Sequence, residues 1–88
     1  MRRKETFENR DKLIQLGLTI ATYRKIKGYS QEQLAEKADI SRSFLSSIET
    51  PSVSRSFSID ILFNIADALD MEPYELLKFS MFSKEDNQ

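Results

Sequence analysis

The chain has 88 residues, which is enough for one small domain that buries a little over ~60% of its unfolded surface. It contains 13 Lys or Arg and 14 Asp or Glu, giving a net charge of −1, and it has neither Cys nor His. This composition excludes disulfides, thiolate metal sites and the commonest general base at neutral pH. The polar start and the lack of an apolar run of about 18 residues argue against a secretory signal and a membrane span. We therefore expect a soluble cytoplasmic protein that is not an enzyme and needs no metal or cofactor.

Charge is unevenly distributed along the chain. Residues 1–27 hold eight Lys or Arg against three Asp or Glu, whereas residues 58–88 hold two against seven. The two ends are expected to form oppositely charged poles of the folded domain, unless these charges merely solvate its surface. For a nucleic-acid partner, this distribution matters more than the net charge.

The N-terminal residues 1–8, MRRKETFE, are interpreted as a basic arm without a packing pattern of its own. Such an arm either contacts DNA phosphates or is a frayed terminus. The main domain is expected over residues 9–79, followed by a short tail at residues 80–88.

The first helix is predicted to start between Thr6 and Arg10 and to end near Lys27, because Gly28 favours helix termination. One apolar stripe, spaced by three and four residues, consists of Leu13, Leu16, Ile20 and Tyr23. A second stripe, on a neighbouring face, consists of Phe7, Ile14 and Leu18. The core needs one stripe, so the second indicates a further partner, either the C-terminal tail or a second subunit. Gly17 costs about 1 kcal/mol relative to Ala in mid-helix, which suggests that another helix approaches closely there.

Residues 30–49 contain two short helical patterns separated by a very short turn. Ser30 and Gln33 form a capping box for a helix predicted over residues 31–38. Its apolar residues, at helical spacing, are Leu34, Ala35 and Ala38.

Ser41 is suited to cap a second helix that begins directly after it. The side chains of this helix that face inward are Leu45 and Ile48. Only Asp39 and Ile40 lie between the two helices, so the helices must cross at a steep angle. Ala35 is small enough to permit that crossing. Together, these features predict a helix-turn-helix.

This stretch is similar to the phage repressor and Cro-like helix-turn-helix domains, also called the Xre family. The residues that match at the family's spacing are Arg24, Gln31, Leu34, Ala35, Ala38, Ile40, Leu45, Ile48 and Glu49. A weaker match extends over residues 13–78. The family usually has Gly in place of Asp39, and Arg-Gly or Asn-Gly in place of Thr50-Pro51. The resemblance implies DNA-binding activity, and it implies a partly buried ion pair between Arg24 and Glu49 that joins the first helix to the recognition helix.

Two more helices are predicted after the polar, serine-rich loop at residues 50–57. Ser58 is suited to cap a helix that ends near Leu69, with Ile61, Leu62, Ile65, Ala66 and Leu69 facing the core. Asp70 and Met71 interrupt the pattern, and Pro73 suits the first turn of a last helix that ends near Lys78. Its inward-facing residues are predicted to be Tyr74, Leu76 and Leu77. The predicted fold is therefore all-α, a compact five-helix domain resembling phage repressors.

The segment after Lys78 begins with three large apolar residues and ends with the polar sequence SKEDNQ. The apolar residues are Phe79, Met81 and Phe82. An exposed cluster of this kind is unusual on a small monomer, so we expect it to form a dimer interface.

The recognition surface is predicted on the outer face of the second helix of the motif, at Arg42, Ser43, Ser46 and Ser47. Arg42 can bind guanine O6 and N7 with two hydrogen bonds, whereas Ser43 and Ser47 can each accept or donate and so tolerate several bases. Phe44 either packs on a thymine methyl group or fills a gap against the first helix of the motif.

Three further residues are expected at the DNA backbone. Gln31 opens the first helix of the motif, and its backbone N–H and side-chain amide can bind a phosphate, which the helix N-terminus favours; the family uses the matching residue in this way. The hydroxyl of Ser41 can reach a phosphate as well as cap its helix. Arg55, in the loop at residues 50–57, either reaches the backbone or adjacent minor groove or is simply solvated.

These features predict a homodimeric, sequence-specific regulator of transcription that binds double-stranded DNA, most simply a repressor on a palindromic operator. The alternative is a protein-interaction module of the antitoxin or anti-repressor type, whose acidic C-terminal third and apolar tail engage a protein partner. A steep salt dependence of binding to one DNA sequence distinguishes the first from the second.

Overall fold

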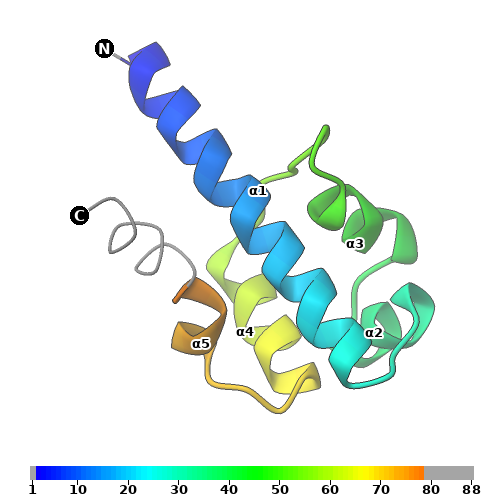
Figure 1. Cartoon of the computed structure of the whole chain (residues 1–88). Helices are drawn as coiled ribbons and strands as arrows, with labels where there is room; N and C mark the ends of the chain where they lie inside the picture. Colours follow the sequence, from blue (N-terminus) through cyan, green and yellow to red (C-terminus); the bar gives the residue numbers. More distant parts are fainter. Residues whose placement is uncertain (1, 79–88) are drawn as a thin grey trace.

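The computed structural model describes residues 2–78, with side chains described from Asn9 onward. Within that range the chain forms five helices and no strands, so the predicted all-α fold is confirmed (Figure 1). The helices are α1 (Arg2–Ile26), α2 (Gln31–Ala38), α3 (Arg42–Glu49), α4 (Ile59–Ala68) and α5 (Pro73–Leu77). No helix in this part of the chain is both long and apolar enough to cross a membrane.

Helix α1 begins earlier than the sequence pattern indicated. Its first helical residue is Arg2, whereas the predicted start was between Thr6 and Arg10, so the stretch interpreted as an arm is helical from Arg2 onward. No sequence signal marks this start, because no capping residue precedes Arg2 and no apolar stripe covers the first turn. The predicted end is correct: Gly28 has φ 81°, and its N–H donates to the carbonyl of Lys25 (3.0 Å).

Side-chain caps start the next three helices at the predicted positions. The hydroxyl of Ser30 accepts from the N–H of Gln33 (3.0 Å), and the Gln33 side chain accepts from the N–H of Ser30 (2.8 Å). Ser41 caps α3 and Ser58 caps α4 in the same manner, each accepting from the N–H three residues on. These caps fix helix starts that a short apolar pattern alone would leave uncertain by several residues.

The core lies where α1 packs on α3 and α2 packs on α4, with α5 covering one side of α1 and α4 (Figure 1). Its buried members are Leu16, Ile20, Leu34, Ala35, Ala38, Leu45, Ile48, Leu62, Ile65, Ala66, Leu69 and Leu76. Two predictions for α5 were wrong: Tyr74 and Leu77 are largely exposed, and Leu76 alone is buried. A helix of five residues presents one core position per turn, so its apolar residues cannot all face inward.

The second apolar stripe of α1 remains partly uncovered. Ile14 is half-buried and Leu18 is 45% exposed, whereas the side chain of Phe7 lies outside the described residues. Because α5 packs against α1, the acidic C-terminal third and the basic first helix are neighbours. The described contacts do not test whether the charges of the two chain ends form opposite poles, and that expectation stays a prediction.

Gly17 permits the close contact between α1 and α3. A Cβ atom at this position would overlap the carbonyl oxygen of Ile48 and lie 3.1 Å from its carbonyl carbon. The obstacle is backbone, which cannot move aside as a flexible side chain would. The close approach expected from the sequence is present, and the neighbouring helix is the recognition helix.

Candidate nucleic-acid interface

The turn between α2 and α3 holds the two helices at the angle of a helix-turn-helix. Asp39 adopts the left-handed conformation, with φ 61° and ψ 42°, and the N–H of Ile40 donates to the carbonyl of Ala35 (3.0 Å). Asp takes this conformation more readily than most residues with a side chain, so it can replace the Gly that the family usually has. Ala35 is buried and leaves room for α3 to cross.

A buried ion pair joins α1 to the end of α3. Nε of Arg24 donates to Oε2 of Glu49 (2.9 Å) and Nη2 donates to Oε1 (3.0 Å), so the guanidinium binds the carboxylate through two parallel hydrogen bonds. The third guanidinium nitrogen, Nη1, donates to the carbonyl of Tyr29 (2.8 Å). Both side chains are buried, and the pair implied by the family resemblance is present.

Gln31 also binds Glu49, a contact that the sequence did not predict. Its amide nitrogen donates to Oε1 of Glu49 (3.0 Å). The first residue of α2 is thereby connected to the last residue of α3, which fixes the α2 N-terminus relative to the recognition helix. The backbone N–H of Gln31 lies in the first turn of α2 and needs no intrahelical acceptor. The predicted phosphate contact therefore stays a prediction, with the backbone as its donor.

The N-terminal half of α3 presents the most accessible side chains of the predicted recognition surface. Arg42 and Ser43 are exposed, and no other described residue pairs with the guanidinium of Arg42. Ser46 and Ser47 are half-buried, and the hydroxyl of Ser47 donates to the carbonyl of Phe44 (2.6 Å). Ser47 therefore has less hydrogen-bonding capacity for bases than its place on the helix suggested.

Phe44 and Arg55 form one unit. Phe44 is half-buried against the core, and the guanidinium carbon of Arg55 lies 4.9 Å from the centre of its ring. The backbone N–H of Arg55 donates to the carbonyl of Ser47 (3.1 Å), which ties the loop to α3. The packing of Phe44 on the core favours the gap-filling role over a base contact, and its ring supports the cation of Arg55 beside the recognition helix.

The loop at residues 50–57 makes its turn without glycine. The N–H groups of Val53 and Ser54 both donate to the carbonyl of Thr50 (2.9 and 2.8 Å), and Ser54 has φ 48°. Ser54 is buried, and its hydroxyl donates to the carbonyl of Pro51 (2.6 Å). These bonds replace the glycine turn of the family and hold Arg55 in place.

One contact to this loop comes from a residue that the sequence did not single out. Nη2 of Arg10 lies 3.5 Å from the carbonyl oxygen of Ser52, at the long end of a hydrogen bond. The two residues are 42 positions apart, and no motif links them. The contact brings a cation of α1 beside the loop that carries Arg55.

The three residues predicted to form a dimer interface, Phe79, Met81 and Phe82, lie outside the described residues. The predicted DNA-facing residues, in contrast, are all described, and they lie on or beside α3, in the loop after it and at the start of α2. These residues are Gln31, Ser41, Arg42, Ser43, Phe44, Ser46, Ser47 and Arg55.

A sequence model of the family HTH_3, helix-turn-helix, matches residues 20–76. The chain belongs to this family. The resemblance to Xre-type domains is thus confirmed. The matched region contains α2, α3 and the turn between them, and also α4.

Relatives in this helix-turn-helix family include regulators of transcription. The HTH-type transcriptional regulator SinR of Bacillus subtilis is 44% identical over 62 residues, which are 70% of this chain and 55% of SinR. SlrR of the same organism is 41% identical over 61 residues, 69% of this chain and 40% of SlrR. The chain thus spans about half the length of the curated relatives it matches.

Solved structures share the arrangement of the helices. SinR, the master regulator for biofilm formation, in complex with DNA has a TM-score of 0.65 and covers 70% of this chain and 97% of its own. The restriction-modification controller protein C.AhdI from Aeromonas hydrophila has a TM-score of 0.69 at 36% identity, covering 73% of this chain and 94% of its own.

Proposed function

We propose that the chain is a sequence-specific regulator of transcription that binds double-stranded DNA as a homodimer on a palindromic operator. The observation that supports this most directly is the exposed start of α3, where Arg42 is accessible. The other end of the same helix is fixed to α1 by the ion pair between Glu49 and Arg24. In a helix-turn-helix the N-terminal residues of the second helix contact base edges in the major groove. SinR, at 44% identity, has been solved in complex with DNA, which supports DNA as the partner of this chain.

The residues divide between base contacts and backbone contacts. Arg42 is proposed to bind a guanine through O6 and N7, with Ser43, Ser46 and Ser47 beside it. The α2 N-terminus at Gln31, the capping residue Ser41 and the guanidinium of Arg55 are proposed to bind phosphates. Phe44 supports Arg55, since the guanidinium carbon lies over its ring.

A homodimer is proposed because one recognition helix contacts too few base pairs for useful specificity. Two α3 helices related by a two-fold axis would read half-sites about 34–36 Å apart. The interface is proposed at Phe79, Met81 and Phe82, which follow closely in the sequence after the exposed apolar residues Tyr74 and Leu77. Repression is the simplest outcome, since a bound dimer can block a promoter. Such a role fits the cytoplasmic location expected from the sequence.

Selection of bound duplexes from a random pool tests this proposal. We expect a palindromic consensus with half-sites one helical turn apart, bound with a steep dependence on salt because phosphate contacts release counterions. A control chain with Arg42→Ala and Arg55→Ala should enrich no consensus. If the unmodified chain enriches no DNA sequence, the proposal is contradicted and the protein-interaction module is favoured.

A further inference from the structure

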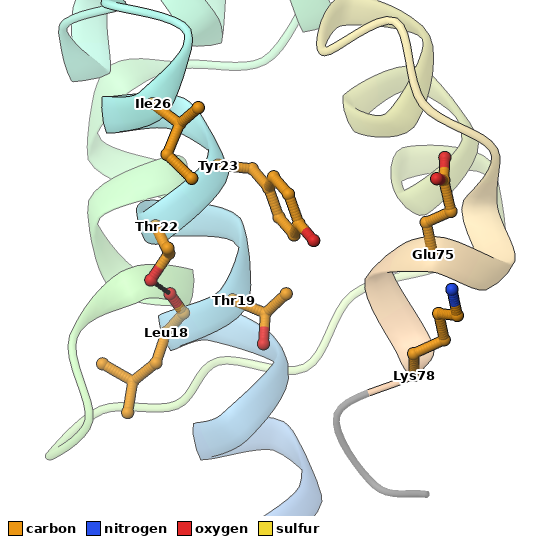
Figure 2. Close-up of a pocket in the computed structure, with 7 residues that line it drawn as sticks. All are labelled: Leu18, Thr19, Thr22, Tyr23, Ile26, Glu75 and Lys78. Atoms are coloured by element: carbon orange, nitrogen blue, oxygen red, sulfur yellow. Dashed lines mark hydrogen bonds between the residues drawn. The ribbon is translucent and has the colours of Figure 1, made fainter. Parts of the chain in front are cut away.

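A groove of about 440 Å³ lies between α1 and α5 (Figure 2). Its lining residues are Leu18, Thr19, Thr22, Tyr23, Ile26, Glu75 and Lys78. The volume falls within the ~300–1,000 Å³ of pockets that enclose a small ligand, so it can receive one or two large side chains. Leu18 is 45% exposed and Ile26 is 68% exposed, which leaves apolar surface uncovered at both ends of the groove.

Three of the polar side chains that line the groove have hydrogen-bond partners within the chain. The hydroxyl of Thr22 donates to the carbonyl of Leu18 and that of Thr19 to the carbonyl of Gln15, both at 2.8 Å, so these hydroxyl protons are used within α1 (Figure 2). The Oε1 atom of Glu75 accepts from the N–H of Glu72 (2.8 Å). Nζ of Lys78 lies 5.8 Å from the centre of the Tyr74 ring. The uncovered side chains of Leu18 and Ile26 favour an apolar occupant.

The chain itself contains an apolar segment of suitable length. Residues 79–82, Phe-Ser-Met-Phe, follow directly on Lys78, which lines the groove. Four extended residues span at most about 13–14 Å, and the eight helical steps from Leu18 to Ile26 cover about 12 Å. The segment can therefore cover the groove from one apolar end to the other.

We infer that residues 79–82 of a second copy occupy this groove, while the same residues of the first copy occupy the groove of its partner. The direction of α5 favours this exchange: Glu75 lies nearer the Ile26 end and Lys78 nearer the Leu18 end (Figure 2). The described part of α5 therefore ends at the Leu18 end of its own groove and points away from Ile26. A reciprocal exchange closes with two-fold symmetry. The inference rests on the proposed homodimer.

Engineered disulfides test the exchange directly, since the chain has no Cys of its own. One full-length chain carries Ile26→Cys alone, a second carries Phe82→Cys alone, and the two are mixed and mildly oxidised. We expect the mixed covalent pair to be the main product, because a disulfide requires Cα atoms within about 7 Å. Val53→Cys replaces Ile26→Cys in the control, since Val53 is also exposed but lies in the loop after α3.

Two results would overturn the exchange. One is a mixed pair no more abundant than in the control. The other is closure of the double variant, Ile26→Cys with Phe82→Cys, within single chains, which would mean that the segment occupies its own groove.

Sedimentation separates this inference from the proposed dimer. Ile26→Lys places a cation at the last residue of α1, where the helix dipole favours it, so folding should be preserved. We expect self-association at least ~10-fold weaker than for the exposed-loop control Val53→Lys. Unchanged association of Ile26→Lys, with a monomeric chain ending at Lys78, would overturn the groove as the receiving site but leave the dimer intact. A full-length chain that is monomeric at all concentrations would contradict the dimer itself.

Discussion

Glu49 connects the three helices that form the recognition surface. It ends α3, and its carboxylate accepts hydrogen bonds from Arg24 of α1 and from Gln31 of α2. Because the carboxylate is buried, its charge is balanced by these donors instead of by water. Glu49 therefore contributes to fixing the orientation of the recognition helix relative to both α1 and α2.

Removal of either partner of the buried ion pair should be costly. Arg24→Ala and Glu49→Ala are each expected to lower the free energy of unfolding by about 3–5 kcal/mol, because the remaining charge is stranded in the core. Urea denaturation of the singles and the double variant measures this, and the double should lose less than the sum of the singles. Arg24→Lys, which keeps the charge without the two parallel bonds, should lie between. Small, additive losses would show that the two residues do not act as a buried pair.

Gly17 should resist a substitution that helices normally favour. Gly→Ala within a helix gains about 1 kcal/mol, but here the added methyl group meets the backbone carbonyl of Ile48. We expect Gly17→Ala to lower the free energy of unfolding by about 1–3 kcal/mol, since α1 and α3 must separate. Lys25→Ala, at an exposed position of α1, is the matched control and should change little. A more stable Gly17→Ala variant would contradict the close packing.

The sequence predicts single residues where a local rule applies to them. The resemblance to the family implied the Arg24–Glu49 pair, and helix propensity marked Gly17 as unusual. The contacts of Gln31 with Glu49 and of Arg55 with Phe44 join residues 18 and 11 positions apart, and no periodicity connects them. Such contacts follow only from the packing of whole helices.

At the scale of elements, the turn between α2 and α3 depends on the conformation of Asp39. Its φ of 61° is costly for a residue with a Cβ atom, but less so for Asp because its short side chain can bond locally. The angle between the two helices, and hence the presentation of α3, depends on this one backbone position.

Asp39→Ala is expected to lower the free energy of unfolding by about 1–2 kcal/mol, whereas Asp39→Gly should retain stability. Thermal or urea denaturation provides the measurement. Glu36→Ala, at an exposed position of α2, serves as the control and should be neutral or stabilising because Ala is the best helix former. If Asp39→Ala proved as harmless as the control, the left-handed turn would not depend on Asp.

Helix boundaries were predictable where a cap chemically marks them. Ser30, Ser41 and Ser58 start α2, α3 and α4 at the predicted positions, and Gly28 ends α1 as expected. The start of α1 was misplaced because polar residues continue the helix without an apolar stripe. The orientation of Tyr74 and Leu77 was misjudged because α5 has too few residues to define a periodic face.

At the scale of the whole molecule, the residues proposed to contact DNA lie around α3, whereas the groove between α1 and α5 is lined by different residues. The first surface is suited to nucleic acid and the second to an apolar segment of a partner. Whole-molecule features were the hardest to predict from sequence. Nothing in the sequence pattern predicts that α5 packs against α1, because the two helices lie at opposite ends of the chain.

We propose that Arg42 contacts a base while Arg55 contacts the DNA backbone, and binding to a panel of single-base operator variants distinguishes the two roles. Arg42→Ala should cost ~1–3 kcal/mol on the preferred site and relax the choice at one base pair in each half-site. Arg55→Ala, the matched loss of one cation, should weaken all variants alike and reduce the salt slope by about one ion. Equal losses across the whole panel for Arg42→Ala would contradict the claim and leave Arg42 as a second phosphate contact.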